Sequence, residues 1–394
     1  MIPSNKREKL DIASLIIAVC VFFKLQPWFL WGTSNYLMLG LLPALYLFAI
    51  VPNMDLKGRN RLMFWIFFIL FLFLCIIQWY NLVFSLATIA VCVVPFINET
   101  KLQKALRYFE IILAVFFAGG LLFYLLVLIG FPLPGRQITA LNFEEFSSGY
   151  IVYPPFLVRR NMELLDYLRF YGPFDEPGVV GTVSLFVLCI ERYNLRKWYV
   201  LVIFVAAFFS FSFMFVAGTI VYLAFTYIKK PSQAILVVIA LIVFYGLTKD
   251  NPVMQQAVYA RLEWDAEAGK FAGDNRYAEA QKEYVEGIRG TNDYFFGDHG
   301  KTAGDFGFSR SYLDAILSYG FIFCFIYVIW FGFYARVRGL SWYTTILFML
   351  IFLLTLYQRP NFTSFSYIFL FSTCVRNWIE GVNPYFDSKA QKNE

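Results

Sequence analysis

Charged residues are scarce in this sequence, since only 15% of its 394 residues are Asp, Glu, Lys or Arg. Ordinary soluble proteins contain about 25%. Hydrophobic residues make up 59% of the chain, and Phe, Trp and Tyr alone make up 21%. This composition excludes a water-soluble fold and predicts a membrane protein whose helices are apolar on nearly every face.

The residue types that bind transition metals are also rare. His299 is the single histidine, and the six cysteines all fall inside apolar stretches without paired spacing. We therefore expect buried cysteines, no disulfide framework, no metal and no cofactor. No glycine-rich nucleotide loop is present, which argues against a nucleotide-driven pump. The net charge of +6 lies in short loops and does not indicate nucleic-acid binding.

Long apolar runs are abundant. A helix of ~20 apolar residues spans a bilayer, and the chain contains about twelve such runs. The fold class predicted is therefore an all-α, polytopic integral membrane protein with a single transmembrane domain over residues 1–394. The expected spans are 11–30, 34–52, 61–79, 81–97, 108–131, 177–191, 198–212, 213–228, 232–248, 311–333, 340–356 and 361–376.

Basic residues occupy alternate loops, and in short loops they accumulate on the cytoplasmic side of a membrane. This alternation predicts that both termini are cytoplasmic. The short loops expected on the outer side offer only Arg359, and the spans carry almost no ionisable residue beyond Lys24. The basic groups precede span one and follow each even-numbered span; they are Lys6, Arg7, Lys9, Lys57, Arg59, Arg61, Lys101, Lys104, Arg107, Arg192, Arg196, Lys197, Lys229, Lys230, Arg336, Arg338, Arg376, Lys389 and Lys392.

Two long polar segments, 132–176 and 249–310, then emerge on the same outer face. Long loops of this kind are usually functional. In the first, apolar residues at helical spacing predict a short amphipathic helix from Arg159 to Tyr171. The second segment is expected to contain two such helices, one bearing Met254, Val258 and Leu262, and one after Asp274 bearing Tyr277, Tyr284 and Ile288.

The junction between the first polar segment and the sixth span combines acidic residues with a helix start. Pro177 suits the first position of a helix, which makes Glu176 the N-cap residue. Glu176 either interacts with the helix dipole or acts chemically, by orienting Arg169 or by accepting a proton from a hydroxyl. Gly178 and Gly181 would allow a neighbouring helix or a lipid chain to approach closely.

Arginines are the basic residues of the first polar segment, and a guanidinium group matches phosphate oxygens bidentately. Arg169, Arg159 and Arg160 are therefore candidate anion ligands, although Arg169 could equally pair with Asp166 on a helix.

In the second segment, Arg276 opposes the dipole of the predicted helix, a placement that makes better sense if an anion also binds there; the alternative is an exposed arginine that pairs with Glu279. Arg310 is either an anion ligand or an interfacial residue. His299, flanked by glycines, is a candidate general base.

The sequence resembles the O-antigen polymerase and ligase superfamily of bacterial cell-surface polysaccharide assembly. The motifs that carry the resemblance are Arg169-x-x-Gly172, then Phe174-Asp175-Glu176-Pro177-Gly178, then Asn275-Arg276, Gly297, Gly300, Ser309-Arg310-Ser311-Tyr312-Leu313-Asp314 and Gly320. About twelve spans with two large outer loops also match, and the resemblance covers most of residues 160–330.

This resemblance implies a GT-C-like, metal-independent glycosyltransferase that uses sugar chains carried on undecaprenyl diphosphate. By motif, Arg169 and Arg276 would bind the diphosphate. Ligases of the superfamily carry a histidine close to the Tyr-Leu pair, whereas here His299 lies upstream of Tyr312-Leu313. That departure favours a polymerase and leaves the catalytic base open between Glu176 and His299.

The expected function is thus a polysaccharide polymerase that acts on the periplasmic face of the bacterial inner membrane. Its expected partners are an undecaprenyl-diphosphate-linked oligosaccharide, membrane lipid and a chain-length-regulating co-polymerase, with no nucleic acid. The alternatives are a ligase that moves the glycan to another acceptor and a non-enzymatic transporter. Transporters usually place ionisable residues at the bilayer midplane, where this sequence has few.

Overall fold

The computed structural model describes residues 10–31, 41–77, 88, 90–138, 149–160, 168–252, 255, 259, 263–265, 270–271, 279–298, 301, 303–306 and 311–382. Within them the chain is mostly helical. The α-helices are α1 Ile12–Phe23, α2 Leu42–Ile50, α3 Arg59–Ile77, α5 Glu99–Leu128, α7 Pro177–Ile190, α8 Trp198–Phe209, α9 Phe213–Tyr227, α10 Pro231–Thr248, α13 Glu279–Gly287, α14 Asn292–Phe296, α15 Tyr312–Val337, α16 Trp342–Gln358 and α17 Phe365–Asn377.

Short 3-10 turns and two small sheets complete the described fold. The 3-10 turns are η1 Trp28–Leu30, η3 Val51–Asn53, η4 Val94–Phe96 and η6 Ala303–Phe306. Strands β1 Arg136–Ile138, β2 Tyr150–Tyr153 and β3 Leu157–Arg160 form an antiparallel sheet, and β4 Trp264–Asp265 pairs with β5 Lys270–Phe271.

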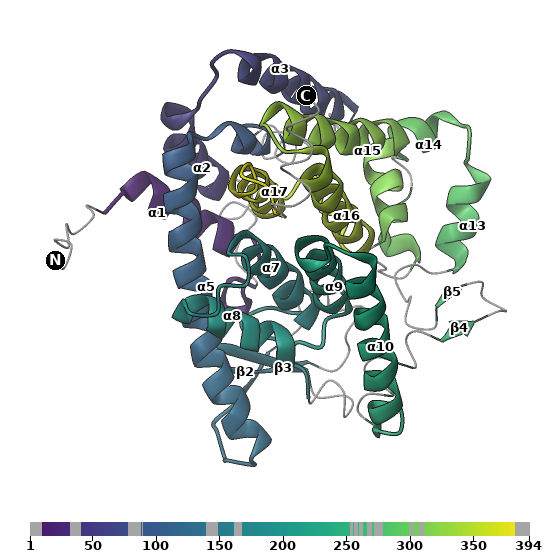
Figure 1. Cartoon of the computed structure of the whole chain (residues 1–394). Coiled ribbons are helices and arrows are strands. Elements are labelled where there is room, and N and C mark those ends of the chain that lie inside the picture. Colours follow the sequence, from purple (N-terminus) through teal and green to yellow (C-terminus); the bar gives the residue numbers. More distant parts are fainter. Residues whose placement is uncertain are drawn as a thin grey trace.

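Helices α7 and α17 form the centre of the bundle (Figure 1). All 14 residues of α7 are buried, and so are Phe365 to Arg376 of α17. A helix that is apolar on all sides is expected to be enclosed by others. Helices α1, α5, α8, α9, α15 and α16 pack around this pair, and their outward faces expose apolar side chains such as Leu125 and Phe333.

Three of the described helices, α3, α5 and α15, are long and apolar enough to cross a membrane. Shorter apolar helices accompany them, namely Ile12–Phe23, Leu42–Asn53, Pro177–Ile190, Trp198–Phe209, Phe213–Tyr227 and Trp342–Gln358. The apolar runs of the sequence therefore do form helices. The count of about twelve spans, the orientation and the extent of the two outer loops stay predictions.

Several helices differ from the expected spans at their ends. Helix α1 stops at Phe23, and Gln26 takes a positive φ of 56° before Pro27. Helix α5 begins at Glu99, earlier than expected, because Asn98 caps it by accepting a hydrogen bond from the Thr100 N–H. Helix α15 is interrupted at Gly320, whose φ is 78°.

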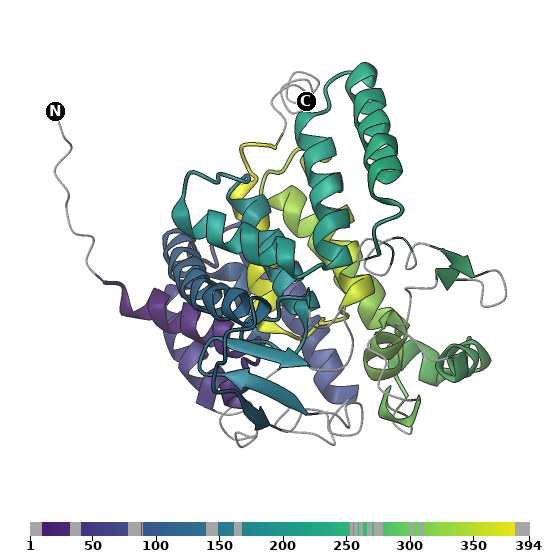
Figure 2. The same cartoon turned by 90° about the horizontal axis from the view of Figure 1, so that it is seen from below.

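The predicted amphipathic helix from Arg159 to Tyr171 is wrong at its start. Residues Leu157–Arg160 form β3, in which Arg159 lies opposite Ile151 of β2. The hydrogen bonds to β2 and the burial of Val158 favour a strand more strongly than the helical spacing of the apolar residues favours a helix. The sheet covers one end of the bundle, as Figure 2 shows from below.

The second polar segment contains part of what the sequence predicts. Tyr284 and Ile288 do lie on one face with Val285, and this face packs against Leu313 and Leu317 of α15. Figure 1 shows α13 and α14 beside the bundle. The other predicted positions, Met254, Val258, Leu262, Asp274 and Tyr277, lie outside the described residues.

Candidate functional site: a charged cavity in the helix bundle

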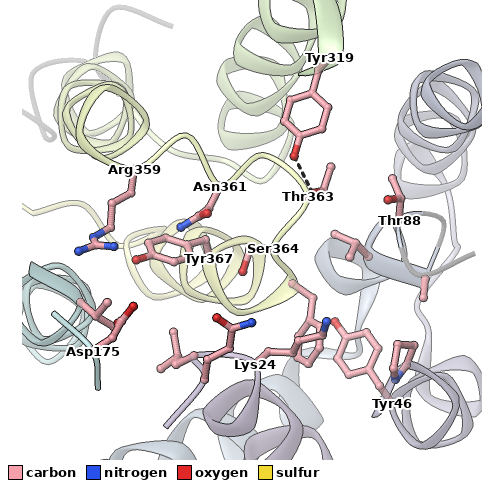
Figure 3. Close-up of a pocket in the computed structure, with 17 residues that line it drawn as sticks. Lys24, Tyr46, Thr88, Asp175, Tyr319, Arg359, Asn361, Thr363, Ser364 and Tyr367 are labelled. Atoms are coloured by element: carbon pink, nitrogen blue, oxygen red, sulfur yellow. Dashed lines mark hydrogen bonds between the residues drawn. The ribbon is translucent and has the colours of Figure 1, made fainter. Parts of the chain in front are cut away.

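A polar cavity of about 310 Å³ lies where the end of α1, the start of α7 and the loop between α16 and α17 meet. Figure 3 shows Arg359 and Asp175 at one side of it and Tyr46 and Thr88 at the other. Its polar lining consists of Lys24, Gln26, Tyr46, Thr88, Asp175, Tyr319, Arg359, Asn361, Thr363, Ser364 and Tyr367. So many polar groups inside an apolar bundle indicate a binding site rather than packing.

Arg359 reaches the cavity because α16 ends at Gln358. Pro360 disfavours the helical region for the preceding residue, and Arg359 has extended φ and ψ of −143° and 94°. Its N–H still donates to the Thr355 carbonyl at 2.7 Å, which fixes the exit of the chain from the helix. The Arg359 side chain is only 5% exposed.

Glu176 forms an ion pair with Arg359, 183 positions away in sequence. As predicted, Glu176 is the N-cap residue of α7 and Pro177 stands at the first helical turn. The Glu176 side chain makes no capping hydrogen bond, so it is available to the guanidinium group. An interaction with the helix dipole therefore does not fully account for Glu176, because its carboxylate also has a specific cationic partner.

A glycine makes room for this ion pair. A methyl side chain at Gly178 would lie 2.7 Å from Arg359 Nη2, which is shorter than a van der Waals contact. The predicted close approach is also seen at Gly181, where a methyl side chain would lie 2.2 Å from Ser212 Cβ. The two glycines of α7 thus serve different neighbours, an arginine side chain and helix α9.

Burial alone would lower the pKa of Arg359, but the neighbouring Glu176 raises this pKa above its ordinary value. Tyr367 and Asp175 act in the same direction. The Arg359 guanidinium therefore stays charged at every physiological pH. A permanent cation in a bundle of apolar helices is costly unless carboxylates or a bound anion neutralise it.

Lys24 brings a second cation to the cavity from the end of α1. Among the residues that the structure describes, Lys24 has no carboxylate within 4.0 Å. The Tyr46 hydroxyl and Arg359 Nε are buried and have no hydrogen-bond partner in the described part of the chain. Buried donors without partners at a cavity wall indicate a site for an anionic or polar ligand.

The arginines predicted in the first polar segment are described in part. Arg169 Nε donates to the Ser210 carbonyl at 3.1 Å, and the neighbouring Phe170 N–H donates to the Phe209 carbonyl. Arg159 is 6% exposed within β3. Arg160 follows it in the same strand, opposite Tyr150. Arg159 and Arg169 are thus held against neighbouring segments, and neither belongs to the cavity lining.

Three other predicted site residues, His299, Arg276 and Arg310, lie outside the described residues. Their roles stay predictions. Asp298, directly before His299, accepts a hydrogen bond from the Tyr284 hydroxyl. This contact raises the pKa of Tyr284 to about 12 and ties Asp298 to α13.

Sequence reasoning did not include Arg359 and Lys24 among the site residues. Each was nevertheless an exception in the sequence, since Arg359 is the basic residue in the short loops expected on the outer side and Lys24 interrupts an apolar span. An ionisable residue that violates both the apolar pattern and the charge distribution is a functional candidate. No group of three or more metal-binding side chains occurs among the described residues.

Comparison of this chain with protein-family models, with curated proteins and with solved structures finds no match in any of the three.

Proposed function

We propose that this protein is a polysaccharide polymerase of the bacterial inner membrane. It would transfer a growing glycan from undecaprenyl diphosphate to the non-reducing end of a lipid-linked repeat unit on the periplasmic face. The observation that carries the proposal is the cavity that holds Arg359 and Lys24 beside Glu176 and Asp175, at the end of the bundle covered by the first polar segment.

The charges of the cavity suit this chemistry. The acceptor hydroxyl attacks the anomeric carbon, the bond from that carbon to the diphosphate oxygen breaks, and the diphosphate leaves with the bonding electrons. Negative charge therefore grows on the leaving group, and fixed cations in a low-dielectric site stabilise it. Arg359 and Lys24 supply such charges without a metal. The hydroxyl proton passes to a base, for which Glu176 and His299 are the candidates.

An apolar groove next to the cavity suits a lipid-linked substrate. It has a volume of about 460 Å³, lies between α15 and α16, and is lined by Tyr312, Val328, Leu350, Leu353, Leu354, Leu356, Tyr357 and Phe362. Phe362 belongs to the same loop as Asn361 and Thr363, which line the cavity. A polyprenyl chain in the groove would place its diphosphate near Arg359.

The test is repeat-unit polymerisation by the purified protein in liposomes that contain the undecaprenyl-diphosphate-linked repeat, with EDTA present. We expect a ladder of polymer from the wild type and at least a hundredfold less from Lys24→Gln, Arg169→Ala and Arg276→Ala. Full ladders from all three variants would contradict the diphosphate assignment. Transfer only to a non-repeat acceptor would indicate the ligase alternative.

A lipid transporter is the second candidate, because α1 ends early at Phe23 and α15 is interrupted at Gly320. Interrupted helices beside a charged site are typical of transporters. Movement of the intact lipid-linked repeat across the liposome membrane, without a new glycosidic bond, would favour this candidate over the polymerase.

The proposed orientation places residues 132–176 and 249–310 in the periplasm and both termini in the cytoplasm. Single cysteines at Ser147 and Thr291, in a background without the native cysteines, should react with an impermeant reagent in cells whose outer membrane alone is permeabilised. A cysteine at Arg196, on the opposite face, is the matched control and should react only after the inner membrane is disrupted. The reverse pattern would overturn the orientation.

A further inference from the structure

Two arginines, the half-buried Arg338 and the buried Arg376, lie far from the cavity, at the other ends of two helices that contribute to it. Tyr319 of α15 and Ser364, directly before α17, line the cavity. Arg338 follows the last residue of α15, and Arg376 lies in the last turn of α17. At 1.5 Å per residue, these arginines lie roughly 28 Å and 18 Å along the helices from the cavity.

Arg376 is only partly paired. Its side chain is 7% exposed, and its Nη1 lies 3.7 Å from Glu99 Oε2 at the start of α5. Its Nε and Nη2 are buried and have no hydrogen-bond partner among the described residues. Glu99 is mostly exposed to solvent, so this pair satisfies one side of the guanidinium group and leaves the other side unmatched.

Arg338 binds η4, the turn against which α17 packs, and is also incompletely bonded. Its Nη2 donates to the Pro95 carbonyl of η4 at 3.2 Å, while its Nε is buried without a partner in the described part of the chain. Burial lowers the pKa of Arg338; Tyr334 and Asp55 oppose this lowering, and the positive charge of Arg376 adds to it. The two guanidinium groups therefore repel each other.

Two cations that repel each other, with three buried N–H donors unsatisfied, are expected to bind an anion, because unpaired buried donors destabilise a folded protein. Arginine is the side chain best matched to phosphate oxygens. We propose that Arg338 and Arg376 form a binding site for a phosphate group, with Arg338 Nε and Arg376 Nε and Nη2 as donors.

The surroundings of the pair are those of a membrane–water interface. The neighbouring Arg336 guanidinium lies 4.4 Å from the centre of the Trp342 ring, and Arg338 lies 5.2 Å from the Tyr334 ring. Aromatic and basic side chains together are typical of the headgroup region, where basic pockets between helices bind anionic lipids. The phosphate belongs either to such a headgroup or to free inorganic phosphate, and the experiment distinguishes these two sources.

The experiment compares the wild type with Arg338→Gln, Arg376→Gln and the double variant, each purified without lipid in a neutral detergent. Thermal stability is measured with added phosphatidylglycerol, with phosphatidylcholine and with inorganic phosphate. Native mass spectrometry counts the bound lipid. Arg196→Gln, which removes an exposed arginine from the same predicted face, is the matched control.

We expect phosphatidylglycerol to raise the Tm of the wild type and of Arg196→Gln, and phosphatidylcholine to have no effect. Each single variant should bind the anionic lipid roughly tenfold more weakly, and the double variant should show no shift. A rise in Tm with inorganic phosphate but not with phosphatidylglycerol would show that the site binds a soluble phosphate and not a lipid headgroup. If a glutamine variant does not fold, Arg376→Lys and Arg338→Lys retain the charge and should still bind more weakly than the wild type.

Two outcomes would overturn the proposal. One is a wild type whose Tm responds to neither the anionic lipid nor inorganic phosphate. The other is a double variant whose response equals that of Arg196→Gln. Both results are independent of polymerase activity, so they do not bear on the proposed function.

Discussion

At the cavity end of the bundle, Arg359 is enclosed and pairs with Glu176 from a distant part of the chain. At the opposite end, Arg376 meets the exposed Glu99 and Arg338 meets a backbone carbonyl. We call these regions the cavity end and the arginine end.

The two ends also differ in how their charges relate to the sequence. Basic residues are numerous at the arginine end, because Arg338 and Arg376 belong to the alternate loops in which the sequence concentrates its lysines and arginines. The cavity lining contains two basic residues, Lys24 and Arg359, and neither belongs to those basic loops. Two cations that depart from the charge pattern of the sequence indicate a site for chemistry, whereas basic residues that follow the pattern are expected to orient the chain in the membrane. Substitutions at the cavity end should therefore affect activity more than stability, and substitutions at the arginine end should do the reverse.

The largest effect is expected from Arg359→Ala. It removes the enclosed cation and leaves Glu176 without this partner, so activity should fall by at least a hundredfold. Stability should fall by about 1–3 kcal/mol, since the Glu176 side chain keeps contact with solvent. Arg359→Lys should recover little, because lysine lacks the guanidinium fork. Polymer ladders and Tm are the measurements.

The exposed Arg196 provides the control for that experiment, because Arg196→Ala should change neither the ladder nor the Tm. An Arg359→Ala variant that polymerises as well as Arg196→Ala would show that the cavity end is not the active site.

Glu176→Gln should lose far more activity than His299→Ala. Glutamine keeps the size of the side chain, but it cannot take the proton of the attacking sugar hydroxyl or hold Arg359 by charge. Rates of repeat-unit addition should be compared at matched expression, and their pH profiles should be recorded. A dead His299→Ala variant beside a fully active Glu176→Gln variant would make the histidine the base and reduce Glu176 to a positioning residue.

Gly178→Ala should give an intermediate effect. The added methyl group would lie 2.7 Å from Arg359 Nη2, so the guanidinium group must shift while its charge remains. We expect activity to fall roughly tenfold and stability by about 1–3 kcal/mol. Gly246→Ala is the control, since a methyl group there meets no atom within 4 Å. An unchanged rate in Gly178→Ala would mean that the position of Arg359 is not critical.

The smallest effect is expected at the end of the bundle away from the cavity, from Asp11→Asn. Asp11 caps α1 and accepts a hydrogen bond from Lys101 Nζ at 2.7 Å. Asparagine caps a helix equally well, so only the ion pair is lost. The free energy of unfolding should therefore fall by about 1 kcal/mol or less. Activity should not change.

The stability difference between the wild type and Asp11→Asn should depend on pH. Lys101 lowers the pKa of Asp11 below its ordinary value, so the ion pair stabilises the folded state above the unfolded pKa of about 4. This stabilisation is lost as pH falls through the lower, folded pKa. Chemical denaturation of the wild type and Asp11→Asn should therefore converge in strong acid, and a constant difference down to that pH would contradict the assignment.

The helices of the bundle are predictable because a long apolar run has one favourable structure in a bilayer, where every backbone polar group must be bonded within the segment. The runs at 177–191 and 198–212 accordingly become α7 and α8 with shifts of a few residues at most. The cap at Glu176 follows from Pro177 in the same local way. The strand Leu157–Arg160 was missed although its partner β2 ends only four positions earlier, because the apolar residues that follow it are spaced as in a helix and that spacing decided the prediction.

The sequence by itself determined that this chain is built mostly of apolar helices, which suits an all-α membrane protein, and that its candidate acidic residue stands at the start of α7. Only the tertiary structure decided which cation meets that residue. Arg169 is seven positions from Glu176 and Arg359 is 183 positions away, yet Arg359 is the one that the loop after α16 brings to Glu176. Ion pairing depends on distance in space, and sequence separation sets that distance only within a single helix or turn.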